Sequence, residues 1–353
     1  METFIVIPCL NEADCIEATC KSLGFGDGAE PGARLVLVDN GSSDATLQVL
    51  GGIQRASPPG RVLVTRELHR GYVSARRAGM AAILAQTHHE QLRDDLVLVL
   101  QADADTIYLP GYVSTMQGAH SGVRGQLLEG SAVTSRDFNL EFPAFANLCR
   151  EVDREMEPWF AAEEAQVVVD DKVCAFLLAD YLAWGEHQDD FDDRGVPVLA
   201  ETTRLHLRAK RCGAVSRCRV EAAVALPSRR RLRTQAPGYF ACSGFPRQSE
   251  WMNAWGGQDE SEFFLRSPDR WPAMSRLIRS RQRHQLALFA LLPAVVEKLN
   301  DLPQGLTPLA DAVRTSSVAR SPGSLLSLML KLADDEHGPL AAMLQQAPRH
   351  VSG

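Results

Sequence analysis

The chain has 353 residues, with 37 Lys and Arg against 44 Asp and Glu, which gives a net charge of −7. This acidic balance argues against a protein that binds nucleic acid along its surface. Hydrophobic residues make up 45% and charged residues 23% of the sequence, as is ordinary for a soluble globular protein. No apolar run approaches the about 18–20 residues of a transmembrane helix. No basic segment followed by an apolar stretch precedes the first predicted strand, so we expect a cytoplasmic protein.

Four short apolar runs in the first hundred residues predict buried strands, and helical patterns separate them. The runs cover residues 3–7, 34–38, 61–65 and 96–100. They are too short for helices and rich in Val, Ile and Leu, as strands buried on both faces are. Strand and helix alternating in this way predict a doubly wound, mostly parallel α/β sheet.

Polar side chains follow three of these strands directly. Asn11 and Glu12 come after the first strand, Asp39 after the second, and Asp103 and Asp105 after the fourth. Ligands of open α/β sheets bind outside the carboxyl ends of the strands, so we expect these residues to share one crevice. Two carboxylates there suit Mg²⁺ or Mn²⁺ bridging phosphate groups. A solvated acidic turn is the alternative for Asp103 and Asp105, since a D-x-D match alone is weak.

Together these residues resemble a known family. The matching blocks are Ile-Pro8-Cys-Leu-Asn11-Glu12, Asp39-Asn-Gly-Ser-Ser-Asp44, Gly71-x3-Ala-Arg76-x2-Gly79 and Asp103-Ala-Asp105 followed by Pro-Gly-Tyr112. In this order and spacing they resemble the family 2 glycosyltransferases, whose fold is called GT-A. The resemblance implies transfer of a sugar from a nucleotide-diphosphate-sugar donor, UDP-, GDP- or dTDP-linked, with Mn²⁺ or Mg²⁺ held by Asp103 and Asp105. It also implies a donor site built from Pro8, Asn11, Glu12, Asp39, Arg76 and Asp103, with Arg76 either near the phosphates or bracing Asp103.

The sequence departs from the family pattern at the position of the general base. Residues 201–213 resemble the family block E-D-x-x-L-x-x-R-x4-G, in which the aspartate deprotonates the acceptor in inverting enzymes. Here Glu201 matches the glutamate, whereas Thr202 occupies the aspartate position. We therefore expect Glu201 to be the base. The alternatives are another carboxylate (Asp170, Asp171, Asp192 or Asp193) or a retaining mechanism that needs no such base.

Two further segments carry predictions. Arg229, Arg230 and Arg231 lie in a segment rich in turn residues, where guanidinium groups can bind a diphosphate and the loop can close over the donor. Residues 276–292 place four arginines before an apolar run, a pattern of a solvated helix face or of a helix on an anionic membrane. The second interpretation implies peripheral contact with the inner face of the membrane and a lipid-linked acceptor. The acceptor is otherwise unknown, with a polysaccharide precursor as the other candidate.

The sequence thus predicts a GT-A domain over residues 1–247 and a helical C-terminal region over 248–353. Within the domain we expect a nucleotide-sugar-binding half (1–118) and an acceptor half (119–247). The predicted function is metal-assisted, inverting glycosyl transfer. One alternative is a sugar nucleotidyltransferase, which would carry a Gly-rich phosphate loop that Pro8–Glu12 lacks. Another is a catalytically degenerate binding module, suggested by Thr202.

Overall fold

The computed structural model describes residues 1–26, 32–160, 165–213, 215–299 and 301–346, and the chain divides into two compact units. The first unit comprises Met1–Ser135, Val169–Asp189 and Ala200–Ser228. The second comprises Arg136–Val168, Asp190–Leu199 and Arg229–Gly353. The second unit therefore begins inside the segment expected to form the acceptor half, and the functional division at residue 247 stays a prediction.

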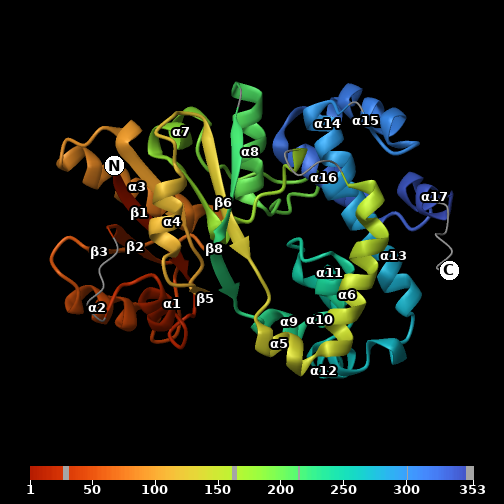
Figure 1. Ribbon diagram of the computed structural model, residues 1–353, viewed down its shortest axis with the longest axis horizontal. Helices are drawn as coiled ribbons and strands as arrows, with labels where there is room; N and C mark the ends of the chain where they lie inside the picture. The colour runs from red at the N-terminus through yellow and green to blue at the C-terminus, as the bar shows by residue number, and fades with distance from the viewer. Residues whose placement is uncertain (27–31, 161–164, 214, 300, 347–353) are drawn as a thin grey trace. The chain divides into compact units, whose positions relative to one another are not determined.

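The first unit is an α/β fold in which a single sheet carries the strands (Figure 1). Its elements in chain order are β1 (Glu2–Cys9), α1 (Ile16–Ser22), β2 (Arg34–Asp39), α2 (Thr46–Ala56), β3 (Val62–Arg66), α3 (Tyr72–His89), η1 (Asp94–Leu96), β4 (Val97–Gln101), β5 (Thr106–Tyr108), α4 (Tyr112–Ala119), β6 (Gln126–Ala132), η4 (Asp171–Val173), β7 (Cys174–Leu177), α7 (Leu178–Ala183), α8 (Glu201–Cys212) and β8 (Ser216–Pro227).

The eight strands lie in the order β3-β2-β1-β4-β7-β6-β8-β5. Strands β3, β2, β1 and β4 pair in parallel, as the alternation of apolar runs and helices predicts. β7 runs antiparallel to both of its neighbours, β4 and β6, and β5 runs antiparallel to β8. β6 and β8 pair in parallel. The predicted mostly parallel sheet is confirmed, with β7 and β5 as the two strands that run against the others.

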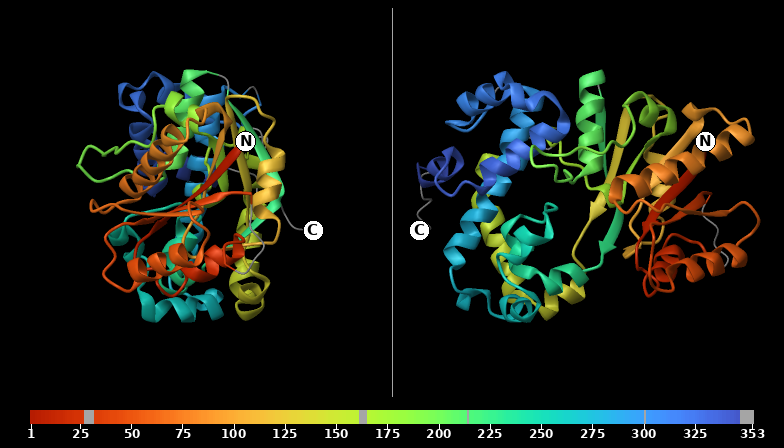
Figure 2. Two further views of the ribbon diagram at one scale, coloured as in Figure 1. Left: turned by 90° about the vertical axis from the view of Figure 1, so that its left-hand side faces the viewer. Right: turned by 180° about the vertical axis from the view of Figure 1, so that it is seen from behind.

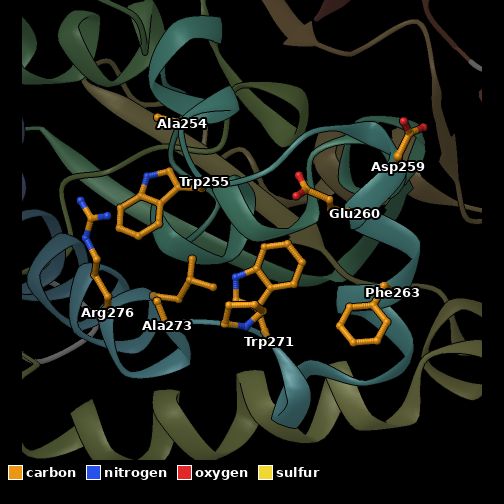
Figure 3. A pocket seen from close by; sticks show the side chains of 10 residues that line it. Ala254, Trp255, Asp259, Glu260, Phe263, Trp271, Ala273 and Arg276 are labelled. Atoms are coloured by element: carbon orange, nitrogen blue, oxygen red, sulfur yellow. The ribbon is translucent and has the colours of Figure 1, made fainter.

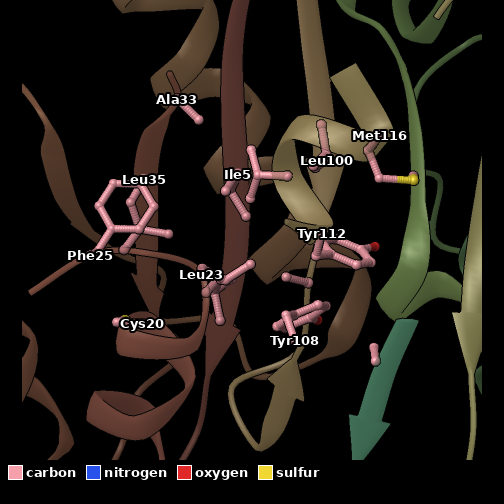
Figure 4. Packing of buried hydrophobic residues seen from close by; sticks show 14 of the residues in the cluster. Ile5, Cys20, Leu23, Phe25, Ala33, Leu35, Leu100, Tyr108, Tyr112 and Met116 are labelled. Atoms are coloured by element: carbon pink, nitrogen blue, oxygen red, sulfur yellow. The ribbon is translucent and has the colours of Figure 1, made fainter. Parts of the chain in front are cut away.

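Helices cover both faces of this sheet. Side chains alternate along β1, so that Ile5 and Ile7 pack with α1, α2 and α4, whereas Phe4 and Val6 pack with α3, α7 and α8. Figure 4 shows the first of these cores around Ile5, Leu35 and Leu100. Helix α3 lies very close to the sheet at Gly79, where an added Cβ would come within 2.5 Å of the Val6 side chain. The strands are therefore buried on both faces, which leaves the ends of the strands as the place for polar side chains.

The second unit is helical (Figures 1 and 2). One of its cores joins Phe145, Phe240 and Phe264, whose rings meet edge to face. Its elements are α5 (Arg136–Glu141), α6 (Pro143–Met156), η2 (Glu157–Trp159), α9 (Arg230–Thr234), α10 (Ala236–Ala241), α11 (Ser249–Asn253), α12 (Gln258–Arg266), η5 (Pro268–Arg270), α13 (Met274–Gln285), η6 (Leu286–Leu291), α14 (Leu292–Glu297), α15 (Leu306–Thr315), η7 (Ser317–Arg320), α16 (Pro322–Asp334) and α17 (Pro339–Gln346).

The apolar run considered for membrane contact is interior to this unit. Leu286, Leu288 and Leu291 are fully buried. Arg281 and Arg283, which precede them, are also buried. These residues pack inside the helical unit and do not present an apolar face to lipid. Over the described residues, no helix combines the length and the apolar character needed to cross a membrane.

Candidate active site

The loops after β1 and β2 are held together by hydrogen bonds, as their place at one edge of a parallel sheet predicts. The Asn11 amide donates to Ser42 Oγ at 3.1 Å, and Asn11 Oδ1 accepts from the Ser43 amide at 2.8 Å. The Glu12 amide donates to Thr46 Oγ1 at 2.8 Å. Asn11 adopts a left-handed backbone conformation with φ 56°, which asparagine tolerates better than most residues. The first two polar loops therefore form one structure.

Asn40 and Asp39 connect this structure to the loop after β3. The Asn40 amide group donates to the carbonyl groups of Glu67 and His69 and accepts from the Gly71 amide at 2.9 Å. Asp39 is fully buried, accepts from the Ser42 amide at 3.2 Å, and lies 3.4 Å from Arg66 Nε. Both Asp39 oxygens thus have partners within the protein, and its recognition of a nucleobase stays a prediction.

A single buried guanidinium group, that of Arg76, gathers three carboxylates at the same edge. Arg76 belongs to α3 and only 2% of it is exposed. Its Nη2 lies 3.2 Å from Asp103 Oδ1 and 2.8 Å from Asp171 Oδ2, and its Nε donates to Glu201 Oε1 at 2.8 Å. Of the two positions that the resemblance left open for Arg76, the structure has the contact with Asp103. A buried charge needs such pairing to offset its loss of hydration.

Asp171 reaches this cluster because β7 runs antiparallel to β4. Leu100 of β4 pairs with Ala175 of β7, so residues that precede β7 lie beside residues that follow β4. The apolar stretch at residues 166–169, just before Asp170 and Asp171, could have been expected to form a strand from its sequence. That stretch is not a strand; the Val169 amide bonds to the Thr203 hydroxyl, and the strand begins after the aspartates.

The cluster holds more negative charge than Arg76 neutralises. Burial and the neighbouring Asp171 charge raise the pKa of Asp103 to about 7, against the opposing effect of Arg76. Burial would also raise the pKa of Asp171, but the positive charges of Arg76 and Lys172 outweigh it and lower that pKa. Lys172 forms an ion pair with Asp170. A site with this balance attracts a further positive charge.

The turn between Asp103 and Asp105 is fixed from two sides. Thr19 Oγ1 of α1 donates to the Ala104 carbonyl at 2.8 Å. The Tyr108 hydroxyl accepts from the Asp103 amide at 3.0 Å and donates to the Lys172 carbonyl at 2.9 Å. The sequence did not predict the contacts of Thr19 and Tyr108, because no local pattern indicates that their hydroxyl groups bond to this turn. The two aspartates stay partly exposed while Ala104 between them is buried.

The residues at this turn fit a divalent cation only with help from a ligand. Among the described residues, no group of three or more His, Cys, Asp or Glu side chains is arranged to hold a metal ion. Mg²⁺ commonly takes one or two protein carboxylates and completes its shell with water and substrate phosphates. Asp103 and Asp105 would supply the two carboxylates of such a site. Their donor set therefore suits a cation that arrives with a diphosphate.

Glu201 and Thr202 are the first two residues of α8, and their side chains contact different groups. Glu201 is 4% exposed and bonded to Arg76, as described above. Thr202 is fully buried, and its hydroxyl donates to Gln101 Oε1 at 3.1 Å, with His187 on the other side of the Gln101 amide. His206, on the same helix, is also fully buried. The Thr202 side chain is therefore part of the buried interior of the first unit.

Arg229, Arg230 and Arg231 begin the second unit, at the start of the short helix α9. The expected loop is therefore partly helical. Arg230 and Arg231 are exposed and Arg229 is half-buried. Their binding of the donor diphosphate stays a prediction.

Comparison with known families supports the first unit's assignment. Residues 4–122 match the family described as Glycosyl transferase family 2. The matched segment spans 119 of the 353 residues. It contains the polar loops after β1, β2 and β4 together with Arg76, so the predicted GT-A type of fold and the assignment to the transferases are confirmed. A search of curated protein sequences finds no match.

Several solved structures align with this chain at low sequence identity and at TM-scores below 0.5. A mannosyltransferase, PcManGT from Pyrobaculum calidifontis, in complex with GDP-Man and Mn²⁺, is 15% identical, with 98% of this chain and 87% of that chain covered and a TM-score of 0.46. S. aureus TarS, residues 1–349, is 12% identical over 94% and 91%, with a TM-score of 0.43. Glucosyl-3-phosphoglycerate synthase from Mycobacterium tuberculosis, with Mn²⁺, UDP and phosphoglyceric acid, is 18% identical over 70% and 80%, with a TM-score of 0.38. At this similarity they do not indicate a donor or an acceptor for this protein.

Proposed function

We propose that the protein transfers a sugar from a nucleotide-diphosphate-sugar to an acceptor hydroxyl at the carboxyl edge of the sheet. The observation that carries the proposal is the cluster on Arg76, which brings Asp103, Asp171 and Glu201 together beside a fixed acidic turn. The donor would lie along the loops after β1 and β2, with Pro8, Asn11, Glu12 and Asp39 at its base and ribose. Arg229, Arg230 and Arg231 are the proposed diphosphate ligands outside the sheet.

Asp103 and Asp105 are the proposed ligands of Mn²⁺ or Mg²⁺. A divalent cation bound there would neutralise the charge that develops on the departing nucleoside diphosphate. The excess of carboxylate charge around Asp103 supports this proposal, as does the fixed geometry of the turn at Thr19 and Tyr108. Arg76 would hold the Asp103 carboxylate in place and favour its ionised form, against the effects of burial and Asp171.

Two carboxylates that share Arg76 are candidates for the general base. Glu201 is the residue that the family block predicts, but its side chain is 5% exposed and bound to Arg76 Nε. The Asp171 side chain is 35% exposed, and a base must come within hydrogen-bond reach of the acceptor hydroxyl. Exposure therefore favours Asp171, with Glu201 fixing the position of Arg76. Either assignment corresponds to an inverting transfer.

The proposal is tested by release of nucleoside diphosphate from UDP-, GDP- and dTDP-sugars in the presence of MnCl₂. We expect turnover of one nucleotide class by the unmodified protein, and a loss of at least about 100-fold in Asp105→Ala or after EDTA treatment. Full activity of Asp105→Ala in EDTA would contradict the metal-assisted mechanism. Asp14→Ala, which alters an exposed carboxylate after β1, is the matched control.

A binding module without catalysis is the second candidate, favoured by Thr202, whose hydroxyl is committed to Gln101. It predicts that a donor binds and stabilises the protein but is never turned over. The assay above separates the two functions, because donor-dependent stabilisation without release of nucleoside diphosphate would assign the module.

A further inference from the structure

The second unit contains a pocket lined by aromatic side chains that no part of the proposed transfer uses. Its volume is about 450 Å³, within the range of small-molecule sites, about 300–1,000 Å³. The pocket lies among the segment after α11, helix α12, η5 and the start of α13, all within the second unit. Figure 3 shows Trp255, Trp271 and Phe263 in a row across it, with Asp259 and Glu260 near one end and Arg276 at the other.

The aromatic walls of this pocket are held by packing behind them. Trp271 packs edge to face against the buried Phe264, with ring centroids 5.3 Å apart. Gly256 has φ +144°, and an added Cβ there would lie 3.2 Å from the Trp271 ring, so the indole rests directly on the backbone. Trp255 packs against Trp251 at 5.6 Å. Phe263 is 46% exposed although it is apolar. The pocket thus presents rigid aromatic surface to solvent.

Charged groups of both signs surround the aromatic row. The Asp259 carboxylate is exposed and has no hydrogen-bond or ion-pair partner among the residues that the structure describes. Glu260 Oε2 accepts from the Gly257 amide at 2.7 Å, which fixes that side chain at the start of α12. Arg276 lies over the Trp255 ring at 4.9 Å and pairs with Glu336 at 2.6 Å. Hydrogen-bond acceptors therefore lie near one end of the row and a donor near the other.

The aromatic row and the charged groups around it favour one chemical class of ligand over others. An anion would meet the carboxylates of Asp259 and Glu260. An organic cation would need the face of Trp255, where the Arg276 guanidinium already lies. A wholly apolar ligand would strip water from three charged groups without replacing their hydrogen bonds. A neutral ring with apolar C–H faces and hydroxyl groups at its edge satisfies both the aromatic row and the charged ends.

We propose that this pocket is a saccharide-binding site of the second unit, which holds a neutral oligosaccharide by stacking on Trp271 and Phe263 and by hydrogen bonds to Asp259. Sugar hydroxyl groups donate to the Asp259 carboxylate and accept from Arg276. The identification of this oligosaccharide as an acceptor of the transferred sugar rests on the proposed function. The binding itself does not need the donor, the metal ion or any residue of the first unit.

The test is isothermal titration of the full chain, without donor or metal, with neutral oligosaccharides of different linkage: maltohexaose, cellohexaose, mannohexaose and chitohexaose. We expect at least one to bind and to change the tryptophan emission. Asp259→Asn and Phe263→Ala should each weaken that binding by about tenfold, since a hydrogen bond to a charged group and a stacked ring have effects of this size. Both side chains are exposed, so neither variant should lower the unfolding temperature.

Asp269→Asn is the matched control, because Asp269 is an exposed carboxylate on the neighbouring η5 that does not line the pocket. It should bind as the unmodified protein does and keep the same rate of donor turnover. Binding of none of the four oligosaccharides would overturn the proposal. So would equal binding by Asp259→Asn and Phe263→Ala, or binding of tetramethylammonium chloride in place of the sugars. These failures are distinct from failure of the proposed transfer, which is read from donor turnover by the unmodified protein.

Discussion

The two units use charged side chains in opposite ways. At the sheet edge of the first unit, Asp103, Asp171 and Glu201 are tied to one another through the buried Arg76. Around the pocket of the second unit, Asp259 has no partner among the described residues and Arg276 pairs only at the surface. A substitution in the linked cluster should change both the stability of the protein and its activity. A substitution of an independent exposed residue should change binding alone. The comparison therefore predicts which substitutions destabilise the protein and which do not.

Removal of the guanidinium at position 76 should have the largest effect. In Arg76→Met three carboxylates lose their common partner, and loss of one member of a buried charge pair typically costs about 3–5 kcal/mol. Urea denaturation measures this loss of unfolding free energy. Arg77→Met is the control on the same helix, since Arg77 is 53% exposed and lies 3.7 Å from Asp189. Its effect should stay under about 1 kcal/mol, and equal effects of the two variants would contradict the linked cluster.

The second unit should instead lose stability through a buried histidine as the pH falls. Burial and the nearby charge of Arg247 lower the pKa of His284 to about 4. Its neutral ring accepts from Arg247 Nη1 at Nε2 and contacts the Ser280 carbonyl at Nδ1. Asp334 and Arg283 are the other charged groups that face it. The unfolded chain takes up a proton near pH 6.5, so this stability is present above that pH and is lost toward pH 4.

The expected loss is about 3 kcal/mol between pH 6.5 and pH 4. Tryptophan fluorescence can follow unfolding of this unit, because the Trp251 and His284 rings lie 5.2 Å apart. His284→Asn should be less stable at neutral pH but should lack this part of the pH dependence. An unchanged slope in the variant would show that His284 does not titrate as proposed.

Substitutions of the two candidate bases, Asp171 and Glu201, should affect different properties of the protein. Asp171→Asn should lower kcat by about 100-fold or more, the usual contribution of a general base, while donor-dependent stabilisation remains. Glu201→Gln should mainly lower the unfolding free energy, because it disturbs Arg76 from inside the protein. The reverse result, with Glu201→Gln abolishing turnover in a fully stable protein, would restore Glu201 as the base.

The smallest effect concerns the hydroxyl that fixes the acidic turn. In Thr19→Val the Ala104 carbonyl loses its donor, at a cost of about 1–2 kcal/mol, and donor affinity in Mn²⁺ should fall a few-fold. Thr87→Val is the matched control, since that buried hydroxyl bonds within α3 to Leu84 at 3.0 Å. It should cost similar stability without any change in donor affinity. Equal donor affinities in both variants would separate Thr19 from the site.

The sheet and several residues of the candidate site could be predicted from the sequence, because both predictions depend on local patterns. Short apolar runs predict β1 to β4, and polar residues at their ends identify Asp39 and Asp103. What the sequence did not predict depends on chain direction and on distant contacts. Asp171 was named as an alternative base, but its contact with Arg76 follows from the direction of β7, which no local pattern encodes. Thr19 and Tyr108 contribute hydroxyl groups from other elements, and the aromatic pocket assembles from short helical segments without a motif.

The most direct test of the central claim is thermal unfolding with UDP-, GDP- and dTDP-sugars, each with and without Mn²⁺. A ligand that binds only the folded state stabilises it by about 2.7 kcal/mol at 100 times its Kd, a rise of about 5 °C or more for a unit of this size. The account predicts such a rise for one nucleotide class, dependent on Mn²⁺ and absent in Asp105→Asn. Equal unfolding temperatures with every donor, or a rise that Asp105→Asn retains in full, would contradict it.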